Sequence, residues 1–285
     1  MHPAPSVIVF TVLSGIGFGF LAYLGAGAVE GAGFWVWGLG YGLAVAGLVA
    51  SSFHLGNPQR ALLAFTQWRT SWLSREAVLS VAALVVLAPM ALSDWLGLGL
   101  PRVVGWVGAA LAVASVTATA MIYAQIRAVP RWHHWVTPVL FLSFALSGGL
   151  ILSGHARVAA MACLALVVAL RVAFRLGDGQ FARAGQTMGT ATGLGGEVSV
   201  FEWPHTGDNY LLREMIHVVG RRHSEKLRLI AMVMAGLLPA LVLLVVPGVA
   251  GAGVAALIHL TGAFAARWLF FAEAEHVVGL YYGRR

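Results

Sequence analysis

The chain has 285 residues, of which 59% are hydrophobic and 10% are charged, and its mean hydropathy is +0.83. Soluble domains carry about 25% charged residues, so a chain this apolar cannot hide its side chains in one soluble core. Its net charge of +7 alone would allow a nucleic-acid partner, but the basic residues lie between apolar runs, as in membrane proteins. Cys163 is the single cysteine, which excludes intrachain disulfides and cysteine-ligated iron–sulfur clusters.

Long apolar runs occupy most of the chain. A membrane-spanning helix needs about 20 apolar residues, and eight runs reach or approach that length. They are residues 6–29, 35–53, 77–93, 103–124, 136–153, 158–176, 229–248 and 252–272. The runs are continuous, whereas strands of a membrane β-barrel would alternate over about 10 residues. We therefore expect an all-α integral membrane protein, with residues 1–285 forming one bundle of eight transmembrane helices.

The arginines are distributed unevenly between the two sides of such a bundle. Eight spans place both termini on one side, together with the loops 54–76, 125–135 and 177–228. Apart from the last loop, that side carries Arg60, Arg69, Arg75, Arg127, Arg131, Arg171, Arg175, Arg284 and Arg285, whereas the other side carries Arg102 and Arg157. Positive residues favour the cytoplasmic side. We therefore expect both termini in the cytoplasm and a multi-pass location in a bacterial inner membrane.

Residues 177–228 form the one sizeable loop in this scheme. It begins with a small, polar part and continues with a segment that predicts a short amphipathic helix around 210–219. Loops this long are usually functional or disordered. We interpret the loop as a cytoplasmic docking surface for a soluble partner.

A polar stretch, HLGNPQRALLAFTQWRTSWLSRE, joins the second and third runs at residues 54–76. His54 can hydrogen-bond a quinone carbonyl and relay a proton, or it is a histidine at a water-facing helix end. Glu76 can exchange a proton at the same membrane face, or it only complements the dipole of a helix capped by Ser74. Arg60 and Arg75 could orient a carboxylate or a quinone oxygen.

Two later segments carry further candidates. Tyr123 ends the fourth run at this face, where it is either an interfacial anchor or a quinone ligand. The last run contains His259, which lies deep in the membrane, and Arg267, which we expect to pair with a carboxylate inside the bundle. Haem in a bundle usually takes two facing histidines, and His259 has no second mid-membrane histidine, so we expect no haem.

Three segments resemble one family. The stretch 54–76 resembles the signature between the second and third spans of the membrane-anchor subunits of the dimethyl sulfoxide reductase family. The segments MIYAQIRAVPRWHHW and RWLFFAEAEHVVGLYY resemble the family's link from the fourth to the fifth span and its C-terminal helix. Within the family, the opening MHPAPSVIVFTVLSGIGFGF looks most like the branch of anchors that serve cytoplasmic sulfite dehydrogenases.

The resemblance implies a haem-free, eight-helix anchor that is not itself catalytic and holds no metal. Such an anchor binds a molybdopterin subunit through an iron–sulfur subunit with four [4Fe-4S] clusters, and exchanges electrons with ubiquinone or menaquinone. His54 matches the family's quinone-linked histidine, and Glu76 matches an acidic residue that follows its signature. We add Arg60 and Tyr123 to this predicted quinone site. The predicted docking residues are Arg69, Arg75, Arg127, Arg131, Trp203 and His205.

These observations predict the quinone-binding anchor of a sulfite-oxidising molybdoenzyme, with membrane lipid but no nucleic acid among its partners. One alternative reverses the electron flow, so that the chain oxidises quinol for a reductase of the dimethyl sulfoxide type. The other alternative is a transporter, which would show inverted repeats and broken helices.

Overall fold

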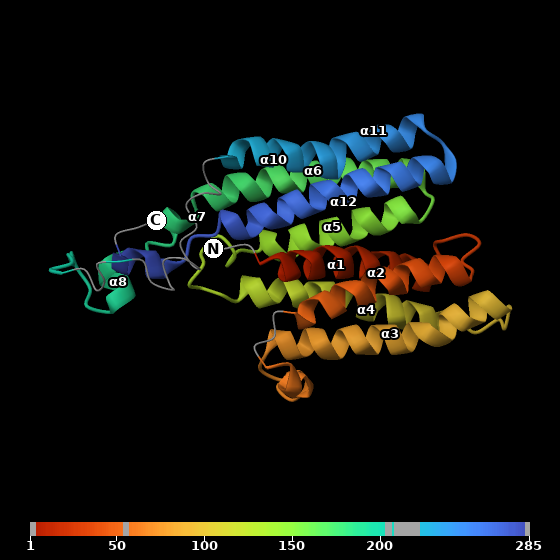
Figure 1. Cartoon of the computed structure of the whole chain (residues 1–285), viewed down its shortest axis with the longest axis horizontal. Helices are drawn as coiled ribbons and strands as arrows, with labels where there is room; N and C mark the ends of the chain where they lie inside the picture. The colour runs from red at the N-terminus through yellow and green to blue at the C-terminus, as the bar shows by residue number, and fades with distance from the viewer. Residues whose placement is uncertain (1–3, 54–56, 203–206, 208–222, 283–285) are drawn as a thin grey trace.

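The computed structural model describes residues 4–53, 57–202, 207 and 223–282. Over these residues the protein is helical and contains no strand. The long helices run side by side along one axis (Figure 1). They are α1 (Pro5–Gly25), α2 (Phe34–Ser52), α3 (Trp72–Leu96), α4 (Arg102–Ala124), α5 (Val136–Leu152), α6 (Ala156–Asp178) and α12 (Gly248–Ala272).

Residues 224–245 form one further long segment built from three consecutive helices. They are α10 (Ser224–Met232), the π-helical turn η3 (Val233–Leu237) and α11 (Leu238–Val245). This segment and six of the helices above are long and apolar enough to cross a membrane, which makes seven candidate spanning segments among the described residues. The remaining helix, α5, is apolar but has 17 residues and is shorter. The predicted integral membrane bundle is confirmed at this level.

Helix α3 begins five residues earlier than the predicted run at 77–93. Ser71 precedes its first residue, so the expectation that Ser74 caps the helix was wrong. The polar residues of the first turns have partners within the fold. Arg75 Nε donates to the Trp68 carbonyl at 3.0 Å and its Nη2 donates to the Arg69 carbonyl at 2.6 Å. Because these hydrogen bonds satisfy the Arg75 side chain, its charge does not prevent the helix from beginning at Trp72.

The π-helical turn is explained by Pro239. Proline has no backbone N–H, so the carbonyl of Ala235, four residues earlier, lacks its α-helical donor. Nδ1 of His259 on α12 lies 2.7 Å from that carbonyl and hydrogen-bonds it. His259, deep in the bundle, therefore donates the hydrogen bond that the Ala235 carbonyl lacks within its own helix.

Helix α1 is the central element of the bundle. It packs against α2, α4, α5 and α12, and it is the most buried of the seven spanning helices. Its backbone comes very close to α5, because a Cβ atom on Gly19 would lie 1.9 Å from the Ala145 carbonyl oxygen. A Cβ atom on Gly149 would lie 2.6 Å from the carbonyl carbon of Gly19. Small residues let the two helix backbones approach this closely, as is common where helices pack against each other inside a membrane.

The short elements lie at one end of the bundle, which we call the loop-rich end (Figure 1). They are η1 (Pro58–Phe65), α7 (Gln180–Arg183), α8 (Met188–Thr192) and η4 (Val277–Tyr282). Helix α1 begins at this end, so the first and the last described elements share it. The amphipathic helix expected around 210–219 lies outside the described residues.

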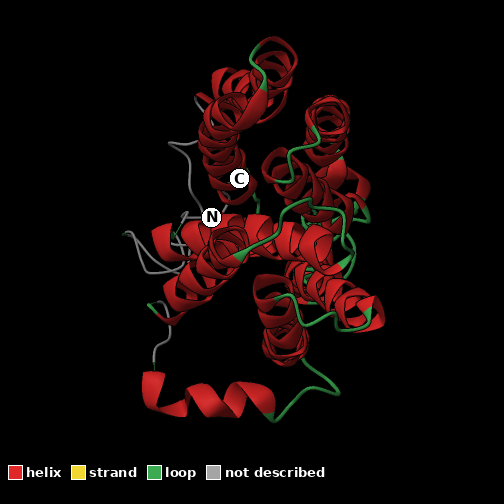
Figure 2. Cartoon of the chain, turned by 90° about the vertical axis from the view of Figure 1, so that its right-hand side faces the viewer, coloured by secondary structure: helices red, strands yellow, loops and turns green. Residues whose placement is uncertain are grey.

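Element η1 lies across the bundle rather than along it, at the bottom of Figure 2. It packs mainly against the start of α3, and its large side chains Leu62 and Leu63 are exposed. The joining stretch between α2 and α3 is therefore a separate, peripheral element.

Candidate functional site

Glu76 lies inside the bundle near the loop-rich end. It is the fifth residue of α3 and its side chain is buried against α4. The hydroxyl of Thr119 donates a hydrogen bond to Glu76 Oε1 at 2.5 Å. One turn deeper, the hydroxyls of Ser80 and Ser115 form a second bond between α3 and α4 at 2.7 Å. Glu76 is therefore a buried carboxyl, not a surface charge at a helix end. It belongs to a line of two buried hydrogen bonds between α3 and α4.

Tyr123 lies on the same face of α4 as Thr119, four residues further along. It is buried among rings of α12 and the segment before α5, with its ring centroid 5.3 Å from those of Trp132 and Phe270. This burial does not suit an anchor at the membrane surface. The rings of Phe141 and Phe270 that contact Tyr123 also contact the guanidinium of Arg267. Thr119, one turn earlier on the same face of α4, bonds Glu76. The structure thus brings together two of the predicted site residues, Glu76 and Tyr123.

Arg267 on α12 completes this group. Its side chain is 5% exposed, and no carboxylate of the described residues lies within ion-pair distance. The guanidinium carbon lies 3.6 Å from the centroid of the Phe141 ring, and Nε has no hydrogen-bond partner. The expectation that Arg267 pairs with a carboxylate inside the bundle was wrong for the described residues, since its guanidinium lies on the Phe141 ring and lines a cavity instead.

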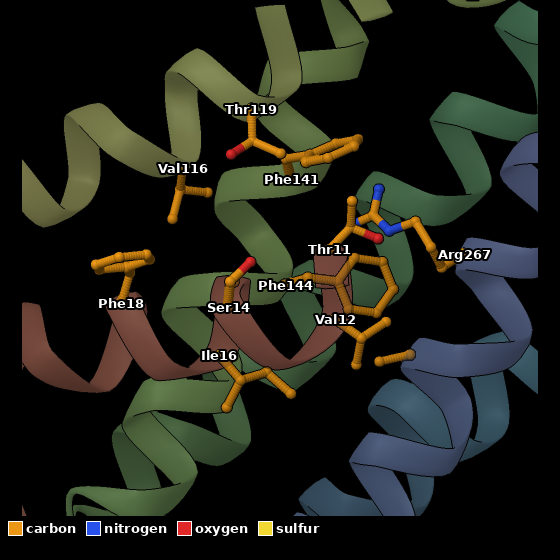
Figure 3. Close-up of a pocket in the computed structure, with 12 residues that line it drawn as sticks. Thr11, Val12, Ser14, Ile16, Phe18, Val116, Thr119, Phe141, Phe144 and Arg267 are labelled. Atoms are coloured by element: carbon orange, nitrogen blue, oxygen red, sulfur yellow. The ribbon is translucent and has the colours of Figure 1, made fainter. Parts of the chain in front are cut away.

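The cavity lies between α1, α4, α5 and α12 (Figure 3). Arg267 and Thr119 line it, together with Thr11 and Ser14 from α1 and a ring of apolar side chains. Its interior volume is about 10 Å³, which is the space that about one water molecule needs. The polar groups suit a carbonyl or a water, but a quinone ring does not fit into this cavity.

The other predicted quinone ligands lie apart from this group. Arg60 is exposed on η1, and Arg75 is held by the loop carbonyls and lies 4.3 Å from the centroid of the Trp72 ring. His54 lies outside the described residues. The structure therefore describes the positions of Glu76 and Tyr123, whereas the role of His54 stays a prediction.

The predicted docking residues fall into three groups. Arg69 and Arg127 are exposed at the loop-rich end, as a docking surface requires. Trp203 and His205 lie outside the described residues. Arg75 and Arg131, by contrast, have partners within the fold. Arg75 bonds the carbonyls of Trp68 and Arg69, and Arg131 is mostly buried and forms ion pairs with Asp178 and Glu273.

These ion pairs belong to a cluster of four charges. Arg228 on α10 lies 2.5 Å from Asp178 at the end of α6 and 2.6 Å from Glu273 after α12. Arg131, from the segment before α5, contacts the same two carboxylates. The cluster joins the ends of several helices, so Arg131 has an internal contact that the sequence did not indicate.

His134 is a titratable group outside the spans, in the segment before α5. Burial lowers the pKa of His134, and the nearby Arg183 and His133 lower it further. A histidine shifted in this direction is neutral at neutral pH. His134 therefore adds no positive charge to the loop-rich end.

The fold and the site define a class of protein: a multi-pass helical membrane protein with a buried carboxyl, phenol and guanidinium near its basic end. Comparison with known proteins gives the family. The profile described as "DMSO reductase anchor subunit (DmsC)" matches residues 2–273. A sulfite dehydrogenase subunit from Allochromatium vinosum is 30% identical over 323 residues, covering 99% of each chain. No solved structure matches.

The chain therefore belongs to the DMSO reductase anchor subunit family, as its motifs predicted. Members of this family are membrane-anchor subunits of oxidoreductases, so the chain is one component of a catalytic complex.

Two residues of the site, Thr119 and Arg267, were not predicted as functional. A signal for Thr119 was present, because it precedes Tyr123 by four residues and so shares its helix face. No comparable signal placed Arg267 beside α4, since that contact depends on the packing of helices far apart in the chain.

Proposed function

We propose that the chain is the quinone-binding membrane anchor of a molybdopterin and iron–sulfur oxidoreductase that oxidises sulfite. An iron–sulfur subunit with four [4Fe-4S] clusters would dock on the loop-rich end and pass electrons to ubiquinone or menaquinone. The family and the sulfite dehydrogenase relative support the anchor role. The exposed Arg69 and Arg127 support docking at this end.

We further propose that all eight helical segments cross the membrane, with both termini in the cytoplasm of a bacterium. The shorter helix α5 is apolar and runs beside the seven spanning helices (Figure 1). The short elements gather at one end (Figure 1). The described arginines Arg69, Arg127 and Arg183 lie on segments at that end, before α3, after α4 and in α7. Positive charge of this kind favours the cytoplasmic face.

The observation that carries the proposal is the buried carboxyl of Glu76 at the loop-rich end. Reduction of a quinone to a quinol takes up two electrons and two protons, and a carboxyl inside the bundle can hold a proton close to the membrane face. Thr119 orients the carboxyl by its hydrogen bond. In this proposal His54 binds a quinone carbonyl, the ring lies on the loop side of Glu76, and Arg60 approaches from η1.

Replacement of His54 by alanine tests the proposal. We expect H54A to abolish quinone reduction, while the soluble subunits still oxidise sulfite with an artificial acceptor. His155 is a matched control, because it is exposed at the opposite end of the bundle, and H155A should leave quinone reduction unchanged. Unchanged quinone reduction in H54A would reject the site.

The direction of electron flow is tested on the native assembly. When the assembly is purified by capturing this chain, it should contain an iron–sulfur protein and a molybdopterin protein. The purified assembly should consume sulfite in the presence of quinone. Consumption of dimethyl sulfoxide with quinol would establish the reverse direction instead. Absence of both partner proteins would contradict the anchor role itself.

A further inference from the structure

A hollow lies between α2 and α3 at the end of the bundle opposite the loop-rich end. Helix α2 begins at that end and α3 finishes there (Figure 1). Helix α2 packs mainly against α1 and α3 mainly against α4, whereas α2 and α3 make few contacts with each other. The hollow has a volume of about 320 Å³, within the usual range of ligand sites of about 300–1,000 Å³.

Two contacts between α2 and α3 border this hollow. The ring centroids of Phe34 and Trp95 lie 5.0 Å apart. Further along the two helices, the hydroxyl of Tyr41 donates to the Leu84 carbonyl at 2.7 Å. The small lining residues between these contacts are Gly38, Ala88 and Ala91. Because these side chains are small, the space between the two helices stays open.

The interior of the hollow suits a hydrocarbon chain. Its two polar groups from α2 already have partners, because the Trp37 indole donates to Asp94 Oδ2 at 3.2 Å and Tyr41 donates to α3. Neither donor is therefore free for a quinone carbonyl, whereas a hydrocarbon chain needs none. The remaining indole of the lining, that of Trp95, belongs to a half-exposed residue at the end of α3. Both helices are long and apolar enough to cross a membrane, so the hollow opens where lipid chains are available.

A positive charge lies beside the same end of the hollow. Arg102 at the start of α4 donates to both oxygens of Asp94 at 3.1 and 2.9 Å, and Asp94 is the carboxylate that Trp37 bonds. The Asp94 side chain is 11% exposed, whereas that of Arg102 is 45% exposed. The carboxylate therefore fixes the guanidinium from inside, and three of its five N–H donors remain for an anion outside. Phosphate is an anion that arginine binds well.

We propose that this hollow binds an acyl chain of one phospholipid, whose phosphate is bound by Arg102 at the membrane surface. The exposed Trp35, Trp95 and Trp106 lie at this end of their helices, as is typical of residues at the membrane surface. The lipid joins the pair α1 and α2 to the pair α3 and α4, where direct helix contacts are few. Its binding is independent of quinone chemistry and of which end faces the cytoplasm.

Native mass spectrometry of the full chain, purified in mild detergent and stripped of lipid, tests the site by titration with phosphatidylglycerol. G38L should remove the tightest binding site, because its side chain fills the hollow and its Cβ atom meets nothing within 4 Å. G42L is the matched control, since Gly42 lies one turn further along α2, also faces open space and does not line the hollow. Equal binding of phosphatidylglycerol by the two variants would overturn the proposal.

The role of the phosphate is tested with a diacylglycerol that has the same chains. The wild-type chain should bind phosphatidylglycerol about tenfold more tightly than this lipid, because the phosphate adds hydrogen bonds between charged groups. In R102Q the two lipids should bind about equally. A preference for phosphatidylglycerol that survives in R102Q would overturn the assignment of Arg102.

A high-resolution structure of the native assembly tests the site without any variant. It should show a hydrocarbon chain between Gly38 and Ala91 and a phosphate beside Arg102. A quinone ring in the hollow, or closure of the hollow by direct contact of the two helices, would overturn the proposal. These measurements do not use quinone turnover, so they can succeed even if H54A rejects the quinone site.

Discussion

At the scale of single residues, the bond from Thr119 to Glu76 is the contact that fixes the buried carboxyl. Removing one partner of a buried hydrogen bond to a charged group costs more than the bond contributes on average, because the group left behind stays desolvated. The bond therefore affects both the stability of the bundle and the orientation of the carboxyl.

Replacement of Thr119 by valine, which has nearly the same shape, should lower the free energy of unfolding by about 1–3 kcal/mol. It should also slow quinone reduction, because the carboxyl loses the donor that orients it. Thr117 on the same helix is the control, since its hydroxyl bonds the Val113 carbonyl of its own helix at 2.9 Å. T117V should keep full turnover, and equal effects of the two variants would contradict the role of Thr119.

The sequence predicted part of this site. Glu76 and Tyr123 were identified because each lies where a polar run meets an apolar one. The structure brings them to the same part of the bundle, because Thr119, one turn before Tyr123 on α4, bonds Glu76. The contact of Arg267 with Phe141 on α5 could not be predicted, because periodicity shows that a residue is on a helix but not which distant helix it faces. His54, Trp203 and His205 remain predictions, because they lie outside the described residues.

At the scale of elements, the contact between α1 and α5 depends on glycine. Where two helix backbones approach this closely, a side chain on either one forces them apart, and overpacking of this kind typically costs about 1–3 kcal/mol. The same argument does not apply to glycines that face open space.

G149A should therefore destabilise the bundle by about 1–3 kcal/mol, because its Cβ atom would meet the backbone of Gly19. Gly42 on α2 is the control, since a Cβ atom there meets nothing within 4 Å. Thermal unfolding in detergent measures both, and G42A should be neutral or slightly stabilising. A loss in G42A as large as that in G149A would argue against close packing as the cause.

The limits of the helices show where sequence patterns fail. Hydropathy set the start of the third span at 77, because Ser74, Arg75 and Glu76 are polar. The helix begins at Trp72, since all three residues are accommodated by its first turns and its neighbours. The π-helical turn near Pro239 was not predicted either. The proline is visible in the sequence, but His259, which bonds the carbonyl that the proline leaves without a donor, lies on a later helix.

At the scale of the whole molecule, the cluster of Arg131, Asp178, Arg228 and Glu273 joins segments from four parts of the chain. Its two carboxylates differ in environment. The Glu273 side chain is 5% exposed, whereas that of Asp178 is 49% exposed. Exposed ion pairs contribute little and are screened by salt, whereas breaking a buried pair is costly.

E273Q should consequently destabilise the protein by several kcal/mol, as expected when a buried pair loses one partner (about 3–5 kcal/mol). D178N is the natural comparison, and its effect should be about 1 kcal/mol or less and should shrink at high salt. Thermal unfolding at low and high ionic strength measures both variants. A larger effect for D178N would show that the cluster is held mainly by its exposed member.

The orientation of the molecule can be tested by labelling introduced cysteines in intact cells. Cys163 is fully buried, so it gives little background. Ser199 lies in the loop that follows α8 and Ala28 lies between α1 and α2, and both are exposed. If the termini are cytoplasmic, impermeant reagents should label A28C in cells with a permeable outer membrane, and S199C only after lysis. The opposite pattern would invert the proposed orientation.

The broad architecture followed from the sequence, because runs of about 20 apolar residues have few structural solutions in a membrane. All eight predicted runs overlap described helices, one of them the shorter α5. The crosswise element η1 was not predicted, because residues 58–65 mix polar and apolar side chains without a clear period.

The central position of α1 has a consequence for how the protein is made. Helix α1 is the first of the described helices to leave the ribosome, yet its neighbours α4, α5 and α12 are synthesised later, and α12 comes almost last. Until α12 is made, the part of α1 that lines the cavity with Arg267, including Thr11, lacks its last neighbour. Early insertion intermediates therefore hold an incomplete centre, and a chain shortened before residue 248 would leave that centre open to degradation.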